Sequence, residues 1–544
     1  MTYLFKPYDG EVKNDTGNPL PVSKDTALNS AQNRIYVDTG LTIPAAFDGE
    51  IKNDVGNPIP ISKDTSANSS SNRIFVDTGL TIPAAFDGEI KNDAGNPIPI
   101  SKNTTVNSAI NPIYVEAKTT PAGGGNDAFG RQRVSEPFTL GDYKHLYALD
   151  PNFVDKTSNG GSVTFVANKA AAQLSTTSNI SSYAAHQTKF YHHYQPGKSQ
   201  TILSSICFGY AQRNVTKRTG YFDDRDGIYF EQVGSNTSDN TDNGTINFVV
   251  RSYVSGSPSE ATQGAYVRRV PQAQWNVDRC DGTGASGFNI DMSKTQLIYM
   301  DFQWLGVGRI RVGFVHNGTY IVAHEYNCSN VLSEVYLSNP NLPVRCEVLN
   351  TGTTTGGSLD QICATVISEG GYSQNGIDWA IAPNARTTAS PAGTILPLVA
   401  IRLKNTFNGY PNRITARLNN VSFYAETNSV YYQIIKLPTA ASLTGTVTWQ
   451  SVNDDSAVEY SVTQTGYVLA DGDMLSAGFI PAGASQNSLS PVSSGEITTA
   501  KKNALNQNFD SNNSEVYLIA VRTITDQGNA TATVGAALQW REIY

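Results

Sequence analysis

Apolar and polar residues alternate in short runs along most of the chain, a pattern typical of β-strands. In the stretch RIRVGFVHNGTYIVAHEY, Ile310, Val312 and Phe314 fall on one face of a predicted strand. The turn that follows, His316–Thr319, contains the Asn-Gly dipeptide that favours a type I′ hairpin. Only one segment, residues 498–508, favours a helix, so we expect an all-β protein.

The N-terminal 120 residues consist of three tandem repeats with a step of 39 residues. The motif DGE opens at Asp9, Asp48 and Asp87, and the motif (N)(R/P)I(Y/F)V opens at Asn33, Asn72 and Asn111. Each copy has two short apolar runs separated by turn residues, which predicts short strands. One copy carries too few large apolar residues to offset the entropy of ordering its backbone. Each repeat must therefore gain stability at a contact.

The segments GNPLP, GNPIP and GNPIP are our candidates for that contact. Their paired prolines remove backbone donors, so the segment can pair along one edge only or run as polyproline II. The contact could be with neighbouring copies, with sister chains in a stalk, or with another protein; we favour a docking arm over a stacked stalk. A flexible linker would tolerate changes in length, whereas the spacing here is constant. The predicted docking residues are Asn18, Pro19, Pro21, Asn57, Pro58, Pro60, Asn96, Pro97 and Pro99.

Beyond the repeats, composition and strand spacing predict three further parts. Residues 121–128, which begin PAGGG, form a Gly-rich linker. Residues 129–425 are expected to form a β-sandwich of jelly-roll type, and residues 426–544 a C-terminal β domain. The last strand is expected to place Trp540 and Tyr544 in a sheet.

Composition and charge exclude several classes of function. The chain has 544 residues, a formal net charge of −8 and 16% charged residues, with no basic stripe, so we expect no nucleic-acid partner. No basic leader with an apolar core begins the chain, and no apolar run of about 18 residues could cross a bilayer. We expect a protein that is made in a cytoplasm and does not insert into membranes.

The metal-ligating residue types show no ligand spacing. The five cysteines have no CxxC pair and are expected to be reduced core residues. His192 and His193 are adjacent and would point to opposite faces of a strand, while His316 and His324 lie in the predicted hairpin. We interpret these histidines as structural and expect no metal and no cofactor.

The densest acidic cluster, GYFDDRDGIYFE, is the candidate for chemistry. Its acidic side chains, Asp223, Asp224, Asp226 and Glu231, could supply the carboxylate pair of a glycosidase or oxygen ligands for calcium. We favour a polar hairpin turn, because the sequence departs from the EF-hand pattern and Gly227 leads into a strand. No GxSxG elbow is present. We therefore expect no enzymatic activity and no catalytic residue.

Four long stretches of the sequence are distinctive: DAFGRQRVSEPFTLGDYKHLY (127–147), YHHYQPGKSQTILSSICFGYA (191–211), KRTGYFDDRDGIYFEQ (217–232) and SKTQLIYMDFQWLGVGRIRVGFV (293–315). They resemble a family of virion structural proteins from tailed bacteriophages, particularly cyanophages and other marine phages. The repeats and the closing LIAVRT…VGAALQWREIY are similar to phrases of the same group. The resemblance covers most of the chain, implies a structural role and supplies no catalytic residues.

The resemblance implies a fibre or appendage at the neck, tail or baseplate of a virion, anchored through its repeats. A capsid decoration protein is the alternative, and a polysaccharide-degrading tailspike is a weaker one. We expect a homotrimer that contacts other virion proteins, with a host-surface glycan as a further candidate partner. In NSVYYQIIKLP, Tyr431 and Ile434 could face either a sister chain or this chain's own core.

Overall fold

The computed structural model describes residues 36–37, 75–76 and 136–544, apart from 239, 264–265, 354, 374, 389–394, 427, 470–471, 482–483, 490–503 and 525–530. The chain divides into two units, residues 1–119 and 120–544. The described residues form strands and three short 3-10 helices, η1 (Ala167–Lys169), η2 (Gln272–Gln274) and η3 (Ala440–Ser442), with no α-helix among them. The expected all-β class is confirmed. No described helix is long and apolar enough to cross a membrane.

In the first unit, the described residues are two short strands from successive repeats. β1 (Tyr36–Val37) and β2 (Phe75–Val76) pair in parallel, with Tyr36 opposite Phe75 and Val37 opposite Val76. Each pair joins residues 39 positions apart, which is the repeat step. Two neighbouring copies therefore contact each other at equivalent positions. The predicted docking residues, from Asn18 to Pro99, lie outside the described residues.

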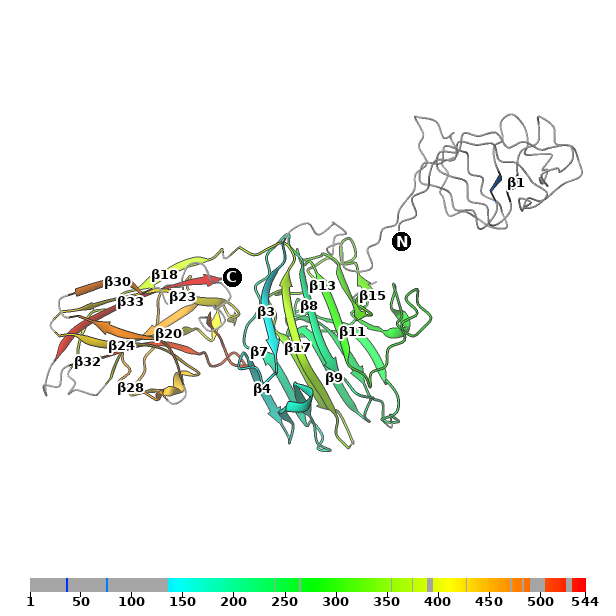
Figure 1. Cartoon of the computed structure of the whole chain (residues 1–544), viewed down its shortest axis with the longest axis horizontal. Coiled ribbons are helices and arrows are strands. Elements are labelled where there is room, and N and C mark those ends of the chain that lie inside the picture. The colour runs from blue at the N-terminus through cyan, green and yellow to red at the C-terminus, as the bar shows by residue number, and fades with distance from the viewer. Residues whose placement is uncertain are drawn as a thin grey trace, which may run out of the picture. The chain divides into compact units, whose positions relative to one another are not determined.

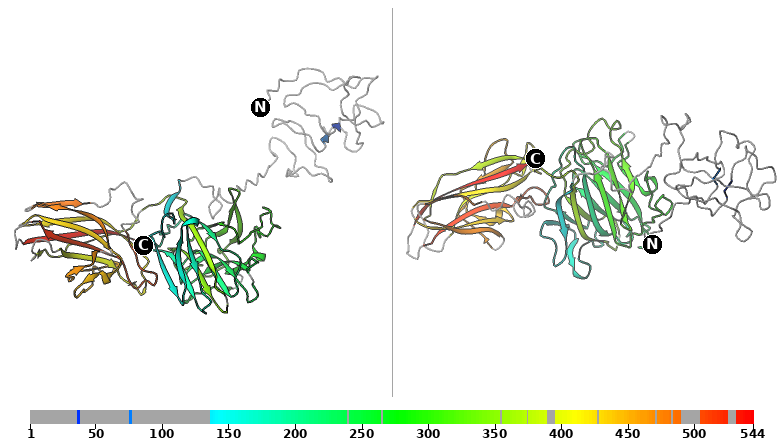
Figure 2. Two further views of the ribbon diagram at one scale, coloured as in Figure 1. Left: turned by 60° about the horizontal axis from the view of Figure 1, so that its bottom comes forward. Right: turned by 45° about the horizontal axis from the view of Figure 1, so that its top comes forward.

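The second unit begins with a sandwich of two antiparallel sheets (Figures 1 and 2). The first sheet contains, in spatial order, β12 (Arg269–Pro271), β11 (Thr245–Arg251), β10 (Gly227–Val233), β9 (Val215–Phe222), β16 (Val344–Asn350), β7 (Tyr183–Thr188) and β4 (Phe153–Ser158). The second contains β15 (Thr319–Tyr326), β14 (Ile310–His316), β13 (Gln296–Phe302), β8 (Gln200–Cys207), β17 (Ser358–Ser368), β6 (Ala171–Ser175) and β5 (Ser162–Val166), with β3 (Phe138–Lys144) paired to β17.

The core of this sandwich follows from the period-2 pattern of its strands. In β10, Ile228 and Phe230 face the core, where Phe230 packs against Phe248 and Phe314. The intervening residues, such as Glu231, therefore project from the opposite face of the sheet. The alternation read from the sequence at Ile310, Val312 and Phe314 is confirmed, since all three are buried in the same core. The outward face of the first sheet carries the charged residues described below.

The C-terminal part of the unit is a second sandwich, coloured yellow to red in Figure 1. One sheet contains β18 (Ile377–Ile381), β33 (Ala532–Ile543), β23 (Thr415–Ala425) and β30 (Ala484–Leu489), with β19 (Arg386–Thr388) paired to β33 and β31 (Ala504–Leu505) to β23. The other contains β26 (Gln450–Ser451), β27 (Val458–Ser461), β20 (Leu396–Leu403), β32 (Val516–Thr523), β24 (Val430–Leu437) and β29 (Asp473–Ile480). Two small hairpin-like pairs are β21 (Thr406–Phe407) with β22 (Tyr410–Pro411), and β25 (Leu443–Thr444) with β28 (Gly466–Tyr467).

The expected boundary between residues 425 and 426 is wrong. Strands β18, β19, β20 and β23 all lie before residue 426 and pair with strands from the last 120 residues: β18, β19 and β23 lie beside β33, and β20 beside β32. The first sandwich ends with β17, at Ser368. Sequence alone placed the boundary at a break in composition, whereas long-range pairing decides which strands belong together.

Three local expectations can be compared with the structure. The turn after β14 has positive φ at both Asn317 (50°) and Gly318 (74°), which confirms the type I′ hairpin. The expected helix at 498–508 is wrong in its described part, because β31 is extended and pairs with β23; residues 498–503 lie outside the described residues. Trp540 is fully buried in β33 as expected, but the expectation for Tyr544 is wrong, because Tyr544 follows that strand and is exposed.

Candidate functional site

The acidic cluster forms the turn between β9 and β10. Phe222 pairs with Gly227, and the Asp223 N–H donates to the Asp226 carbonyl across 2.8 Å. The Asp223 carboxylate accepts the backbone N–H groups of Arg225 (2.7 Å) and Asp226 (2.9 Å). The cluster therefore closes a tight hairpin, as the sequence favoured. Its fourth acid, Glu231, lies farther along β10 and belongs to a different set of contacts.

Glu231 belongs to a set of charged residues on the outward face of the first sheet. Register places Arg218 of β9 opposite Glu231 of β10 and also opposite Glu347 of β16. Opposite cross-strand residues have their Cβ atoms about 5 Å apart, so these side chains meet directly. The Arg218 Nε atom lies 2.8 Å from Glu231 and its Nη1 atom 2.7 Å from Glu347.

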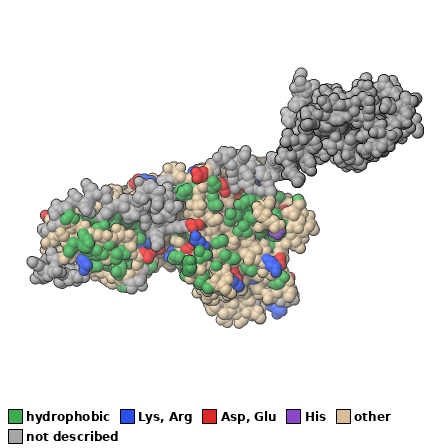
Figure 3. Space-filling view, in the orientation of Figure 1, with side chains coloured by type: hydrophobic (Ala, Val, Ile, Leu, Met, Phe, Trp, Pro, Cys, Tyr) green, Lys and Arg blue, Asp and Glu red, His purple; other side chains and the backbone are tan. Residues whose placement is uncertain are grey.

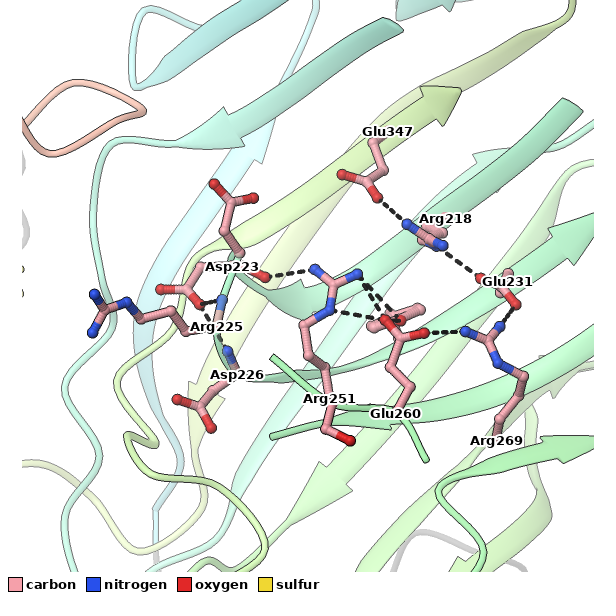
Figure 4. A network of polar contacts seen from close by, with 12 residues as sticks. Arg218, Asp223, Arg225, Asp226, Glu231, Arg251, Glu260, Arg269 and Glu347 are labelled. Carbon is pink, nitrogen blue, oxygen red and sulfur yellow. Dashed lines mark hydrogen bonds and ion pairs between the residues drawn. The ribbon is translucent and has the colours of Figure 1, made fainter. Parts of the chain in front are cut away.

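The chain of ion pairs continues in both directions from Arg218, and Figure 4 shows the part from Glu347 through Glu231, Arg269 and Glu260 to Arg251. On one side, Arg345 contacts Glu347 at 2.7 Å and Asp224 at 2.7 Å. On the other, Arg269 bridges Glu231 to Glu260, and Arg251 pairs with Glu260 at 2.9 Å. We call this set the outward network; its members are Asp224, Arg345, Glu347, Arg218, Glu231, Arg269, Glu260 and Arg251.

The electrostatics of the outward network keep its central carboxylate ionised. Burial raises the pKa of Glu347, but the guanidinium groups of Arg345 and Arg218 outweigh burial and lower that pKa from 4.5 to about 2. A general acid in glycoside hydrolysis needs a raised pKa so that it holds a proton near neutral pH. Glu347 has the opposite property, and the Glu231 carboxylate is shared between Arg218, Arg269 and Asn247.

Burial raises the pKa of the Asp226 carboxyl group above its usual value. Its oxygens accept the N–H of Tyr253 (3.1 Å), the N–H of Ser338 (2.8 Å) and the Ser338 hydroxyl (2.5 Å). These three donors fix the turn to two neighbouring loops. The carboxyl group therefore acts as a structural anchor between chain segments.

The histidines lie in structural positions. The two nitrogens of His192 contact the Tyr143 hydroxyl (2.8 Å) and the Leu342 carbonyl (3.0 Å), and His324 accepts the Asn276 N–H (3.2 Å). Burial lowers the pKa of His193 and of His324 from 6.5 to about 4. His316 is exposed at the hairpin turn and packs beside Phe288.

The cysteines and acidic groups form no metal centre among the described residues. All five cysteines are free thiols; Cys280, Cys328 and Cys346 are buried and the other two partly buried. Burial raises the pKa of the Cys328 thiol to about 11 and that of Cys346 to about 12. These thiols are therefore poor nucleophiles and fit the core role that the sequence predicted.

A pocket of about 550 Å³ lies within the second unit, beside the acidic turn. One wall comes from the first sandwich, namely residues 223–226 and 338–341. The other comes from the second sandwich, namely residues 407–414 and Tyr544. Arg413 holds the two walls together, because it donates to Asp223 across 3.0 Å and its guanidinium lies over the Tyr191 ring at 4.1 Å.

The β21–β22 hairpin shapes one side of this pocket. Asn408 (φ 50°) and Gly409 (φ 82°) both have positive φ, which is the type I′ geometry that an Asn-Gly turn adopts. The turn projects Tyr410, which is 66% exposed, and places the Phe407 ring 6.0 Å from that of Tyr544. Aromatic rings and polar groups therefore meet at the mouth of one pocket.

Sequence reasoning missed both the outward network and the pocket. A signal existed for the network: VRCEVLN places Arg345 and Glu347 two residues apart in an apolar strand, hence on one face. The TFNGYP segment carried the same Asn-Gly signal as the hairpin at Asn317, but that signal does not tell which distant loop faces it.

The face seen in Figure 3 agrees with the charge pattern of the sequence. Lys and Arg side chains lie in small groups among acidic and uncharged ones, and no extended basic area is visible on that face.

Comparisons with known proteins do not assign the chain to a family. No family model matches it, and no curated protein matches its sequence. Among solved structures, a β-1,3-glucanase from Mycobacterium marinum is 10% identical with a TM-score of 0.28, covering 42% of this chain and 98% of that one. A legume lectin-like domain from Entamoeba histolytica is 9% identical with a TM-score of 0.25, covering 42% and 97%. Likenesses at this level do not bear on what the chain binds or does.

Proposed function

We propose that the protein is a structural component of a tailed-phage virion, a fibre or appendage at the neck, tail or baseplate that is anchored through its N-terminal repeats. The observation that carries this proposal is the parallel pairing of β1 with β2 at the repeat step. A strand in a sheet can pair on both sides, so paired copies can accept a further strand from the same chain, a sister chain or another virion protein. That property suits an attachment segment.

The sandwiches form the projecting part in this proposal. Their strands bury extensive apolar cores, and the carboxylates of the outward network are neutralised by arginines. An ionised, ion-paired Glu347 supports a structural or binding role over hydrolysis of polysaccharide. The protein would be assembled in the host cytoplasm, reside in the virion, and act as a homotrimer in contact with other virion proteins.

Immunogold electron microscopy of the phage that encodes the chain tests this proposal. Antibodies raised against residues 136–544 should label purified particles at the neck, tail or baseplate. Labelling spread over the capsid would favour the alternative, a decoration protein that clamps the shell. Particles that carry no label, together with absence of the chain from the proteins of purified virions, would overturn the proposal.

A further inference from the structure

The charged groups that line the pocket differ in whether they already have partners. Asp223 and Asp226 are buried and accept the hydrogen bonds described above, and Arg413 is bound to Asp223 and to the Ser511 hydroxyl. Arg225 is different: its guanidinium lies over the Tyr253 ring at 4.3 Å, and it forms no ion pair with a described residue. In Figure 4 its side chain points away from the outward network. The pocket thus offers a cation that is available to a ligand.

Amide groups supply uncommitted donors on the same wall. The Asn341 side-chain oxygen accepts the Tyr194 N–H (2.8 Å), and the Asn339 side-chain oxygen accepts the Asn341 N–H (2.9 Å). These bonds fix both side chains while leaving each NH₂ group without a partner among the described residues. An amide NH₂ can donate two hydrogen bonds, and fixed donors of this kind suit hydroxyl groups of a ligand.

The opposite wall supplies aromatic surface. Tyr410 projects from the hairpin turn, and the Tyr544 hydroxyl is held by the Asp455 carbonyl (2.9 Å) and the Glu542 carboxylate (3.1 Å). Its ring is thereby fixed beside Phe407. The face of an aromatic ring packs well against the C–H face of a pyranose, whose hydroxyl groups point outward around the ring's edge.

We propose that this pocket binds a pyranose residue that carries a carboxylate, as in the uronic acids of an acidic polysaccharide. Arg225 pairs with the carboxylate, Asn339 and Asn341 donate to hydroxyl groups, and the Tyr410 ring covers the C–H face. An arginine forms charge-assisted bonds to a carboxylate in a fixed, planar geometry, which gives preference over a neutral sugar. The inference rests on the proposed function, since it assigns the outward-facing sandwiches a glycan of the host surface as a ligand.

The test is isothermal titration calorimetry of the full chain with hexagalacturonate and, as the neutral probe, a galactose hexamer with the same linkage. We expect hexagalacturonate to bind at least about tenfold more tightly, and the preference to fall as salt is raised. Arg225→Gln should abolish the preference, because it should weaken binding of hexagalacturonate at least about tenfold. Tyr410→Ala should weaken both.

Matched controls lie elsewhere on the second unit. Arg279 and Tyr147 are exposed and do not line the pocket, so Arg279→Gln and Tyr147→Ala should bind both hexamers as the wild type does. Equal affinity for the two hexamers, wild-type preference in Arg225→Gln, or no detectable binding of either would overturn the inference. Immunogold labelling of particles is independent of these results, so failure of the pocket and failure of the virion assignment remain distinguishable.

Discussion

At the scale of single residues, the outward network shows how buried charge is retained in a β-sheet. Glu347 and Arg345 are almost completely buried, where an isolated charge would be very unfavourable. Alternation of sign across the strands gives each charge partners, because register sets Arg218 opposite both Glu231 and Glu347. Removal of one partner leaves the other charge buried and uncompensated, which costs about 3–5 kcal/mol.

Glu347→Gln tests this account through its pH dependence. The pKa of Glu347 is about 2 in the folded protein and near 4.5 in the unfolded chain, so the unfolded chain takes up the proton first as pH falls. Wild-type unfolding free energy should therefore drop between pH 4.5 and 2, by about 3 kcal/mol from this group. The variant should be less stable at pH 7 and approach the wild type near pH 2.

Urea denaturation at a series of pH values measures this difference. Asp454→Asn changes an exposed carboxylate in a turn of the second sandwich and serves as the control, which should follow the wild type throughout. A constant difference between Glu347→Gln and the wild type from pH 7 to pH 2 would contradict the ionised network.

Lys217 provides a second prediction, in a higher range of pH. Its ammonium donates to the carbonyls of Phe208 and Tyr210, yet burial lowers its pKa from 10.5 to about 7. The unfolded chain holds that proton more tightly, so the unfolding free energy should rise by up to about 2 kcal/mol between pH 7 and 8.5. Lys217→Met should lack this rise. The exposed Lys294→Met should retain it, and an identical slope in Lys217→Met would show that another group is responsible.

At the scale of elements, β33 organises the second sandwich. The strand runs from Ala532 to Ile543, with β18 and β19 along one edge and β23 along the other. Trp540 is fully buried in the core of the second sandwich, and its indole N–H donates to the Glu542 carboxylate (3.0 Å). A late segment of the chain therefore completes a sheet that was begun more than a hundred residues earlier.

Trp540→Ala should destabilise the second sandwich by about 3–5 kcal/mol, because it removes a large buried side chain and leaves a cavity. Differential scanning calorimetry should show a lower melting temperature for that sandwich. Tyr424→Ala, an exposed position on the neighbouring β23, is the control and should change little. Unchanged melting of Trp540→Ala would mean that β33 is dispensable.

The strands and turns also show which parts of the structure could be predicted from the sequence. Strand alternation and the Asn317-Gly318 turn were predictable because both depend on neighbouring residues. The core assignment of Ile434, left open between a sister chain and this chain, follows only from its pairing beside Ile519. Likewise, the Arg218 contacts depend on which strands adjoin β9, and local sequence patterns do not determine the register between distant strands. Most of the candidate site could therefore not be predicted from the sequence.

At the scale of the whole molecule, the proposed function includes assembly into a homotrimer. The edge strand β29 exposes Phe479, which is 64% accessible in a single chain. Exposed apolar residues on an edge strand favour aggregation unless another surface covers them. A closed homotrimer would cover such edges symmetrically.

Light scattering of the full chain and of a variant beginning at Gly124 tests this assembly. We expect both to have the mass of a trimer, because the contact is expected between β-sandwiches. A monomeric variant beside a trimeric full chain would show that the repeats hold the subunits together as a stalk. Monomers in both cases would refute the trimer itself.

The register between β1 and β2 has a consequence for how the length of the chain can change. Each pair joins a residue to its counterpart 39 positions later. Gain or loss of a complete repeat by duplication or deletion in the gene therefore recreates the same junction, whereas a change of a few residues displaces it. The length of the N-terminal segment can thus change during evolution by complete repeats of 39 residues, while the pairing between neighbouring repeats stays the same.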